Sequence, residues 1–213
     1  MFKSKAALAA LIPLSLVACS TPDNQLTEMG VTATRTACPA VAIPAATGDI
    51  TLFNPERSRD SSAIDVVASI TNLRSTCNDA GDTIVTNVTF DVQAQRRDAR
   101  GAREVVLPYF AVAVQGGTQV QSKSVSRVGL RFADGELRAS TSASATGQVS
   151  RAAVTLPEDV RQQITRRRKP GDPSAAIDPM ADPTVREAVR RASFEVLVGF
   201  QLTQEQLAYN ATR

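Results

Sequence analysis

The chain has no histidine and no tryptophan, and only two tyrosines occur among its 213 residues. Without an imidazole group, Ser-His-Asp and Cys-His catalytic arrangements are excluded, as are zinc sites that use histidine. The shortage of large aromatic rings argues against the stacking platforms that bind sugars or single-stranded nucleic acid. We therefore expect no cofactor, no metal site, no nucleic-acid partner and no enzymatic activity.

The N-terminus has the order of features of an export signal. Lys3 and Lys5 precede an apolar stretch, residues 6–18, which is shorter than the roughly 20 residues that a spanning helix needs. The segment LVAC at 16–19 follows, with small residues immediately before Cys19. This segment resembles the lipobox of bacterial lipoprotein precursors, so residues 1–18 are expected to be a lipoprotein signal peptide.

The lipoprotein resemblance implies that Cys19 becomes the first residue of the mature chain and carries acyl chains such as palmitate. Two or more acyl chains anchor a protein stably in a membrane, where one chain does not. Ser20 stands where an aspartate would indicate retention in the inner membrane. The resemblance therefore implies an outer-membrane lipoprotein that faces the periplasm. The alternative is an ordinary secreted protein in which Cys19 has no such role.

Removal of the signal peptide changes the charge balance. The precursor carries a net charge of +3 and a pI near 9.0, but Lys3 and Lys5 would be lost with residues 1–18. The mature chain then carries about +1. A chain so close to neutrality gives no electrostatic argument for binding nucleic acid.

The two cysteines that remain after lipidation predict a disulfide. Cys38 and Cys77 form an even pair, and an exported chain enters an oxidising compartment. A bridge between them would close a loop of about 40 residues and stabilise the fold by about 4 kcal/mol on the chain-entropy model. The alternative is a pair of free thiols that act in redox chemistry or bind a metal.

Hydrophobic periodicity divides the mature chain into an anchor and tether at 19–47 and a single domain at 48–213. Apolar residues alternate with period two around Val66 to Ile70 and around Val88 to Ala94, which predicts half-buried strands. Segment 104–115 is apolar on both faces and predicts a central strand, with a bulge or bend at Leu107-Pro108.

Two turns can be tested by the register that they impose. A two-residue turn at Asp134-Gly135 would pair Phe132 with Leu137 and join two strands as a hairpin. A three-residue loop at 116–118 would set Val114 opposite Val120. Segment 139–150, rich in serine and alanine, is interpreted either as an exposed edge strand or as a flexible segment.

Helices are predicted near the C-terminus, around 157–168 and 183–192. The first begins at an apparent capping box from Thr155 to Glu158, and the second begins at Asp182-Pro183. A last strand at 194–202 and a turn capped by Thr203 follow. Because strands dominate and no βαβ order occurs, we predict a mainly β fold, an antiparallel immunoglobulin-like β-sandwich with a C-terminal helical insertion.

The strongest local concentration of charge is a basic cluster at the end of the first predicted helix. Cations at this position favour the helix dipole, which explains the cluster without a ligand. The alternative is a binding site for phosphate, lipopolysaccharide or an acidic protein. The cluster consists of Arg166, Arg167, Arg168 and Lys169.

These features favour a non-enzymatic envelope protein that binds or scaffolds another envelope protein. A lipidic or small-ligand binding protein is the alternative and would need a closed apolar pocket, while a carboxylate-dependent envelope hydrolase would need two carboxyls in one cleft. In its LPYF-like segment at 107–110 and its FQLT-like segment at 200–203, the mature part resembles alphaproteobacterial lipoproteins. That resemblance implies no particular activity.

Overall fold

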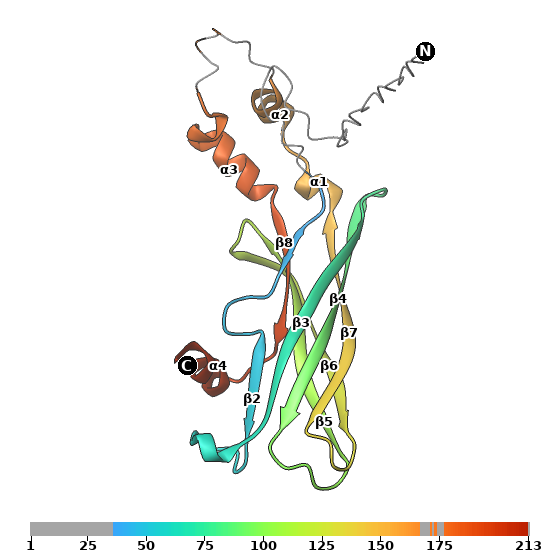
Figure 1. Cartoon of the computed structure of the whole chain (residues 1–213). Helices are drawn as coiled ribbons and strands as arrows, with labels where there is room; N and C mark the ends of the chain where they lie inside the picture. The colour runs from blue at the N-terminus through green and yellow to red at the C-terminus, as the bar shows by residue number, and fades with distance from the viewer. Residues whose placement is uncertain (1–35, 167–170, 172, 174–176, 213) are drawn as a thin grey trace, which may run out of the picture. The chain divides into compact units, whose positions relative to one another are not determined.

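Alternating apolar and polar residues form long strands that pack as two layers. The computed structural model describes residues 36–166, 171, 173 and 177–212. Segments 36–166 and 177–212 belong to one compact unit, in which two four-stranded sheets face each other (Figure 1). The described part of the chain is thus mainly β and sandwich-like, as the sequence predicts.

Each sheet combines strands that are distant in the sequence. The first sheet has the order β1 (Ala40–Ala42), β8 (Phe194–Phe200), β5 (Arg103–Gln115) and β6 (Gln119–Phe132). The second sheet has the order β2 (Asp49–Phe53), β3 (Ile64–Asn78), β4 (Thr83–Arg96) and β7 (Arg138–Ser150). Neighbouring strands are antiparallel except β1 and β8, which are parallel.

The core lies between the sheets and is built from the inward-facing positions of each strand. The alternation predicted around Val66 to Ile70 and around Val88 to Ala94 is confirmed, since these apolar positions are buried. Three phenylalanines from both sheets fill the centre and are at most 1% exposed. They are Phe90, Phe132 and Phe200. Interdigitated side chains therefore occupy the space between the sheets.

The three-residue loop at 116–118 is confirmed, because Val114 pairs with Val120. Gly116 and Gly117 both have positive φ, which glycine adopts without a steric penalty. The hairpin predicted at Asp134-Gly135 is wrong. Phe132 pairs with Arg103 in the first sheet, whereas the next strand, β7, pairs with β4 in the second. The turn therefore carries the chain from one sheet to the other.

A buried arginine links this turn to the other connection between the sheets. Arg96, at the end of β4, is only 2% exposed, and its guanidinium donates to four backbone carbonyl oxygens at 2.6 to 2.8 Å. These carbonyls lie in the two connections between the sheets, 97–102 and 133–137. Arg96 thereby satisfies backbone groups that neither connection satisfies by itself. The four acceptors are Ala99, Gly101, Ala133 and Glu136.

The sequence predicts a bulge or a bend at Leu107-Pro108, and the bulge is wrong, because Pro108 does not interrupt the pairing of β5 with β6. Pairing with β6 is regular through Pro108, and the irregularity lies between Ala113 and Val114. The carbonyl of Pro108 accepts a hydrogen bond from the backbone N–H of Gln201, on the β8 side. Because the N and C=O of one residue face the same side of a strand, the missing N–H takes no bond from β6. The ladder with β6 therefore stays intact.

The prediction that 139–150 forms an edge strand is confirmed, because β7 is the last strand of the second sheet. The carbonyl of Leu137, directly before β7, accepts a hydrogen bond from the backbone N–H of Arg96 in β4. The N–H and C=O groups of the odd-numbered residues of β7 therefore face β4. Even-numbered residues then face the free edge. One of their carbonyls, that of Ser144, accepts a hydrogen bond of 2.8 Å from the hydroxyl of Tyr109, whose ring packs edge-on against Phe90. Tyr109 thus covers the middle of this edge.

Replacement of Tyr109 by phenylalanine tests this cover. The variant keeps the ring in the core and loses only the hydrogen bond to Ser144, so the free energy of unfolding is expected to fall by about 1 kcal/mol. Urea unfolding would measure the change. Ser144→Ala is the matched control, because it leaves the carbonyl in place and should stay within about 0.5 kcal/mol of the wild type. Equal stability of Tyr109→Phe and the wild type would contradict the assignment.

Among the described residues, three α-helices lie between β7 and β8, and a fourth follows β8. They are α1 (Arg151–Val154), α2 (Glu158–Thr165), α3 (Pro183–Arg191) and α4 (Gln204–Thr212). Short 3₁₀ helices occur at Ser61–Ala63 and Pro179–Ala181. No helix among the described residues is both long enough and apolar enough to span a membrane.

The helix termini agree in part with the sequence analysis. Asp182 caps α3 by accepting from the Thr184 N–H, as expected at Asp182-Pro183. The capping box at Thr155 is wrong, because the Thr155 hydroxyl donates to the carbonyl of Arg151 and α2 begins after Pro157 without a side-chain cap. Thr155 therefore ends α1 rather than beginning α2.

Helix α4 lies beside β2 and covers the outer edge of the second sheet (Figure 1). The side-chain amide of Asn210 donates to the carbonyls of Ala46 and Asp49, and the ring of Tyr209 packs edge-on against Phe53 at 5.2 Å. A helix in this position protects an edge strand from further pairing. The two remaining long edges of the sandwich are β6 and β7.

Strand β1 lies within the segment that the sequence analysis assigns to the tether, 19–47. It pairs with β8 over only three residues, from Ala40 to Ala42. Its shortness explains why no alternation was detected there. The folded body thus begins before residue 48.

Candidate functional site

The two cysteines expected to pair are bonded to each other, which confirms the predicted disulfide. The sulfur atoms of Cys38 and Cys77 are 2.02 Å apart and the Cα atoms 6.1 Å apart. Cys38 lies two residues before β1 of the first sheet, and Cys77 lies near the end of β3 in the second. The disulfide therefore joins the two layers of the sandwich.

The other sequence-predicted positions fall largely outside the described residues. Cys19, the predicted lipidation site, lies outside them, and so do Arg167, Arg168 and Lys169 of the basic cluster. Arg166 is described and is exposed directly after α2. Among the described residues, no three metal-ligating side chains lie close enough together to hold an ion.

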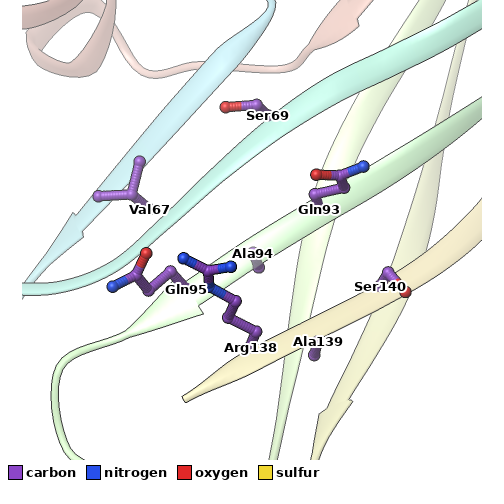
Figure 2. A pocket seen from close by; sticks show the side chains of 8 residues that line it. All are labelled: Val67, Ser69, Gln93, Ala94, Gln95, Arg138, Ala139 and Ser140. Carbon is purple, nitrogen blue, oxygen red and sulfur yellow. The ribbon is translucent and has the colours of Figure 1, made fainter.

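A shallow groove runs across the outer face of the second sheet. Its volume is about 630 Å3. Side chains from β3, β4 and β7 form its floor, and Figure 2 shows them rising from three neighbouring strands. The lining residues are Val67, Ser69, Gln93, Ala94, Gln95, Arg138, Ala139 and Ser140, of which Ala94 and Ala139 direct their side chains to the core.

The strand register groups these side chains in rows across the sheet. Gln95 pairs with Arg138, and Gln93 pairs with Ser69 on one side and Ser140 on the other. Within the part of the chain that the structure describes, the amides of both glutamines and the guanidinium of Arg138 form no hydrogen bond or ion pair. The groove therefore offers free donors and acceptors for a polar ligand but no nucleophile with a neighbouring base.

A carboxylate lies on the same face, one row away from the groove. Asp91 accepts hydrogen bonds from the Ser142 hydroxyl at 2.7 Å and the Asn72 amide at 2.8 Å. These hydrogen bonds, that of Ser142 above all, lower the pKa of Asp91. Asp91 is thus an ionised group held by its neighbours rather than a proton donor near neutral pH.

A second carboxylate with a lowered pKa lies in the connection after β4. The guanidinium of Arg100 donates to both carboxylate oxygens of Asp98, at 2.6 to 3.0 Å, and lowers the pKa of Asp98 to about 2. Both side chains are exposed. An exposed pair of this kind fixes local geometry and contributes little to stability.

The aromatic residues of segment 107–110 divide between the core and the surface. Tyr109 is 7% exposed and belongs to the core between the sheets. Phe110 is half-buried on the outer face of the first sheet, where the Lys123 ammonium lies 5.3 Å from its ring centre. Tyr109 is therefore a core residue, while Phe110 contributes to a surface with a neighbouring cation.

The described surfaces also contain residues that the sequence analysis did not single out. Gln93, Gln95 and Arg138 come together only because β7 lies beside β4, a pairing that follows from the change of sheet at 133–137. The burial of Arg96 could have been predicted from the sequence, because Arg96 occupies the next inward-facing position after Val92 and Ala94. A charged residue in the inward phase of a strand indicates a buried polar network.

Comparison with known proteins gives no relative. No family model matches this chain, no curated protein matches it, and no solved structure matches it.

Proposed function

We propose that this chain is a bacterial lipoprotein that is anchored through acylated Cys19 in the outer membrane, faces the periplasm and binds or scaffolds another envelope protein. The observation that carries the proposal is the Cys38–Cys77 disulfide. Disulfides persist in oxidising compartments, and this one uses two of the three cysteines. The third cysteine is the one in the lipobox-like segment.

The absence of histidine from the sequence supports a binding role over catalysis, because the common hydrolase triads need an imidazole. The two long edge strands, β6 and β7, support it from the structure, since edge strands are sites where another chain can pair. We further propose that the sandwich is of immunoglobulin-like type, with α1, α2 and α3 inserted before its last strand. The succession of antiparallel strands in two sheets supports this assignment.

The alternative, a carrier for a lipidic or other small ligand, has less support. Such a carrier needs an apolar cavity of some hundreds of Å3, and the space between the sheets is filled by buried side chains such as Phe90 and Phe132. The groove on the second sheet is lined mainly by polar side chains. A lipid that copurifies with the protein in native mass spectrometry would revive this alternative.

Mass spectrometry of the N-terminal peptide tests the anchor. We expect the wild type to begin at Cys19 with acyl chains attached and to fractionate with the outer membrane, and we expect Cys19→Ala to lose both properties. The double variant Cys38→Ala, Cys77→Ala is the matched control, since it removes the other two cysteines but should still be acylated. An intact, unmodified N-terminus on wild-type protein in the cytosol would overturn the proposal.

A further inference from the structure

Within the described part of the chain, no strand pairs with the outer edge of β6, which is a long row of backbone groups. The carbonyl of Pro108 faces β8, so the odd-numbered residues of β5 face β6. Their partners on β6 are even-numbered, as in the pair of Tyr109 with Ser126. The N–H and C=O groups of the odd-numbered β6 residues therefore face the free edge. These residues are Lys123, Val125, Arg127, Gly129 and Arg131.

The same residues direct a regular charge pattern to the outer face of the first sheet. Lys123, Arg127 and Arg131 occur at every fourth residue, and β6 contains no aspartate or glutamate. Among the described residues, none of the three cations has a carboxylate within 4.0 Å. Val125 lies between two of the cations and is 55% exposed. An edge so arranged matches a strand with acidic side chains at every fourth residue.

Self-pairing of β6 is disfavoured by these charges. If two copies of β6 pair antiparallel about Arg127, Lys123 lies opposite Arg131, and about Val125 it lies opposite Arg127. Like charges directly opposite each other destabilise a pair of strands. The cations thereby exclude a second copy and select an acidic partner, because specificity needs repulsion of the wrong partner as well as attraction of the right one.

The other long free edge, β7, does not have these properties. The hydroxyl of Tyr109 donates a hydrogen bond to the carbonyl of Ser144 in the middle of that edge. Arg138 is the one charged residue of β7. Its side chains are otherwise small and neutral. Strand β6 therefore combines free backbone groups with cations at every fourth residue. Strand β7 instead has a carbonyl in the middle of its edge that accepts a hydrogen bond, and a single cation.

We propose that β6 is a strand-addition site, at which an extended acidic segment of an envelope protein partner pairs as a further strand of the first sheet. Backbone hydrogen bonds to the odd-numbered residues provide the affinity, and carboxylates opposite Lys123, Arg127 and Arg131 provide the register. This inference deepens the proposed binding role. It does not depend on acylation, so it can be tested with the Cys19→Ala protein as well as with the wild type.

The probe is a labelled extended peptide with glutamate at every fourth residue and threonine or valine between. Fluorescence anisotropy should show saturable binding to the full chain, and hydrogen exchange should show new protection in 119–132 and none in 138–150. Arg127→Glu is expected to weaken binding at least tenfold. Arg138→Glu, the matched control on the other free edge, should change the affinity less than twofold. A peptide with lysine at its central acidic position should bind Arg127→Glu better than the original peptide does.

Two further measurements separate strand addition from simple charge attraction. A peptide of equal charge with proline at alternate residues cannot form the ladder and should not bind. Equal binding of the proline peptide would overturn the proposal. So would binding of anionic phosphatidylglycerol vesicles through Arg127 without protection of β6 by the acidic peptide, since the cations would then serve a membrane surface. The anchor test above is independent of both results.

Discussion

Replacement of Arg96 by methionine is expected to lower the free energy of unfolding by about 3 to 5 kcal/mol, because four hydrogen bonds from a buried charged group are lost. The side chain is 2% exposed and donates to four carbonyls in the two connections between the sheets. Methionine fills part of the volume but leaves these carbonyls without a donor, and each unsatisfied buried group costs about 1 to 3 kcal/mol before relaxation.

Urea unfolding followed by circular dichroism would measure this loss. Arg100→Met is the matched control, because Arg100 lies in the same connection but is 91% exposed and pairs only with Asp98. Its effect should stay below about 1 kcal/mol. Arg96→Lys keeps the charge but presents a single ammonium group, so an intermediate stability is expected. An unfolding midpoint for Arg96→Met equal to that of the wild type would show that the guanidinium does not hold the connections together.

The second large effect is expected from removal of the disulfide. Cys38 and Cys77 are 39 residues apart, and the chain-entropy model assigns about 4 kcal/mol to a loop of this length. The double variant Cys38→Ala, Cys77→Ala should unfold at correspondingly lower urea concentrations. Both changes remove a constraint on the unfolded chain, while the side chains of the sandwich core are unchanged.

Reduction provides the control for the disulfide. Wild-type protein in excess dithiothreitol should reach the stability of the double variant, and the double variant should not respond to dithiothreitol. Stability that is the same with and without the bridge would contradict the expectation. Arg96 lies opposite Val66 and Cys77 opposite Thr86, at opposite ends of the β3–β4 pair. The losses from the two sites should therefore add within about 0.5 kcal/mol.

Period-two alternation is a local property, and it predicted the strands well. The inward phase of Val88 to Ala94 and the register of Val114 with Val120 both follow from neighbouring residues. The hairpin at Asp134-Gly135 was predicted by the same reasoning and is wrong. The hairpin register also pairs apolar residues, so it does not distinguish a hairpin from a change of sheets. The contacts of Arg96 with both connections are non-local and cannot be inferred from the turn residues.

The candidate sites were less predictable than the strands for the same reason. The disulfide could be predicted, because cysteines in an exported chain pair and only one pairing remained after Cys19. The free edge of β6 could not be predicted, because it depends on the order of strands in the sheet. The relation of Lys123 to Arg127 and Arg131 becomes visible only once the strand order places all three on one edge.

The parallel contact between β1 and β8 constrains how this protein is made. The first strand of the described chain and the last one are neighbours in the same sheet, and β8 also separates β1 from β5. A nascent chain that lacks residues 194–200 leaves β1 without its neighbour and exposes the flank of β5. The first layer can therefore be completed only after residues 194–200 have emerged, and until then the flank of β5 stays uncovered.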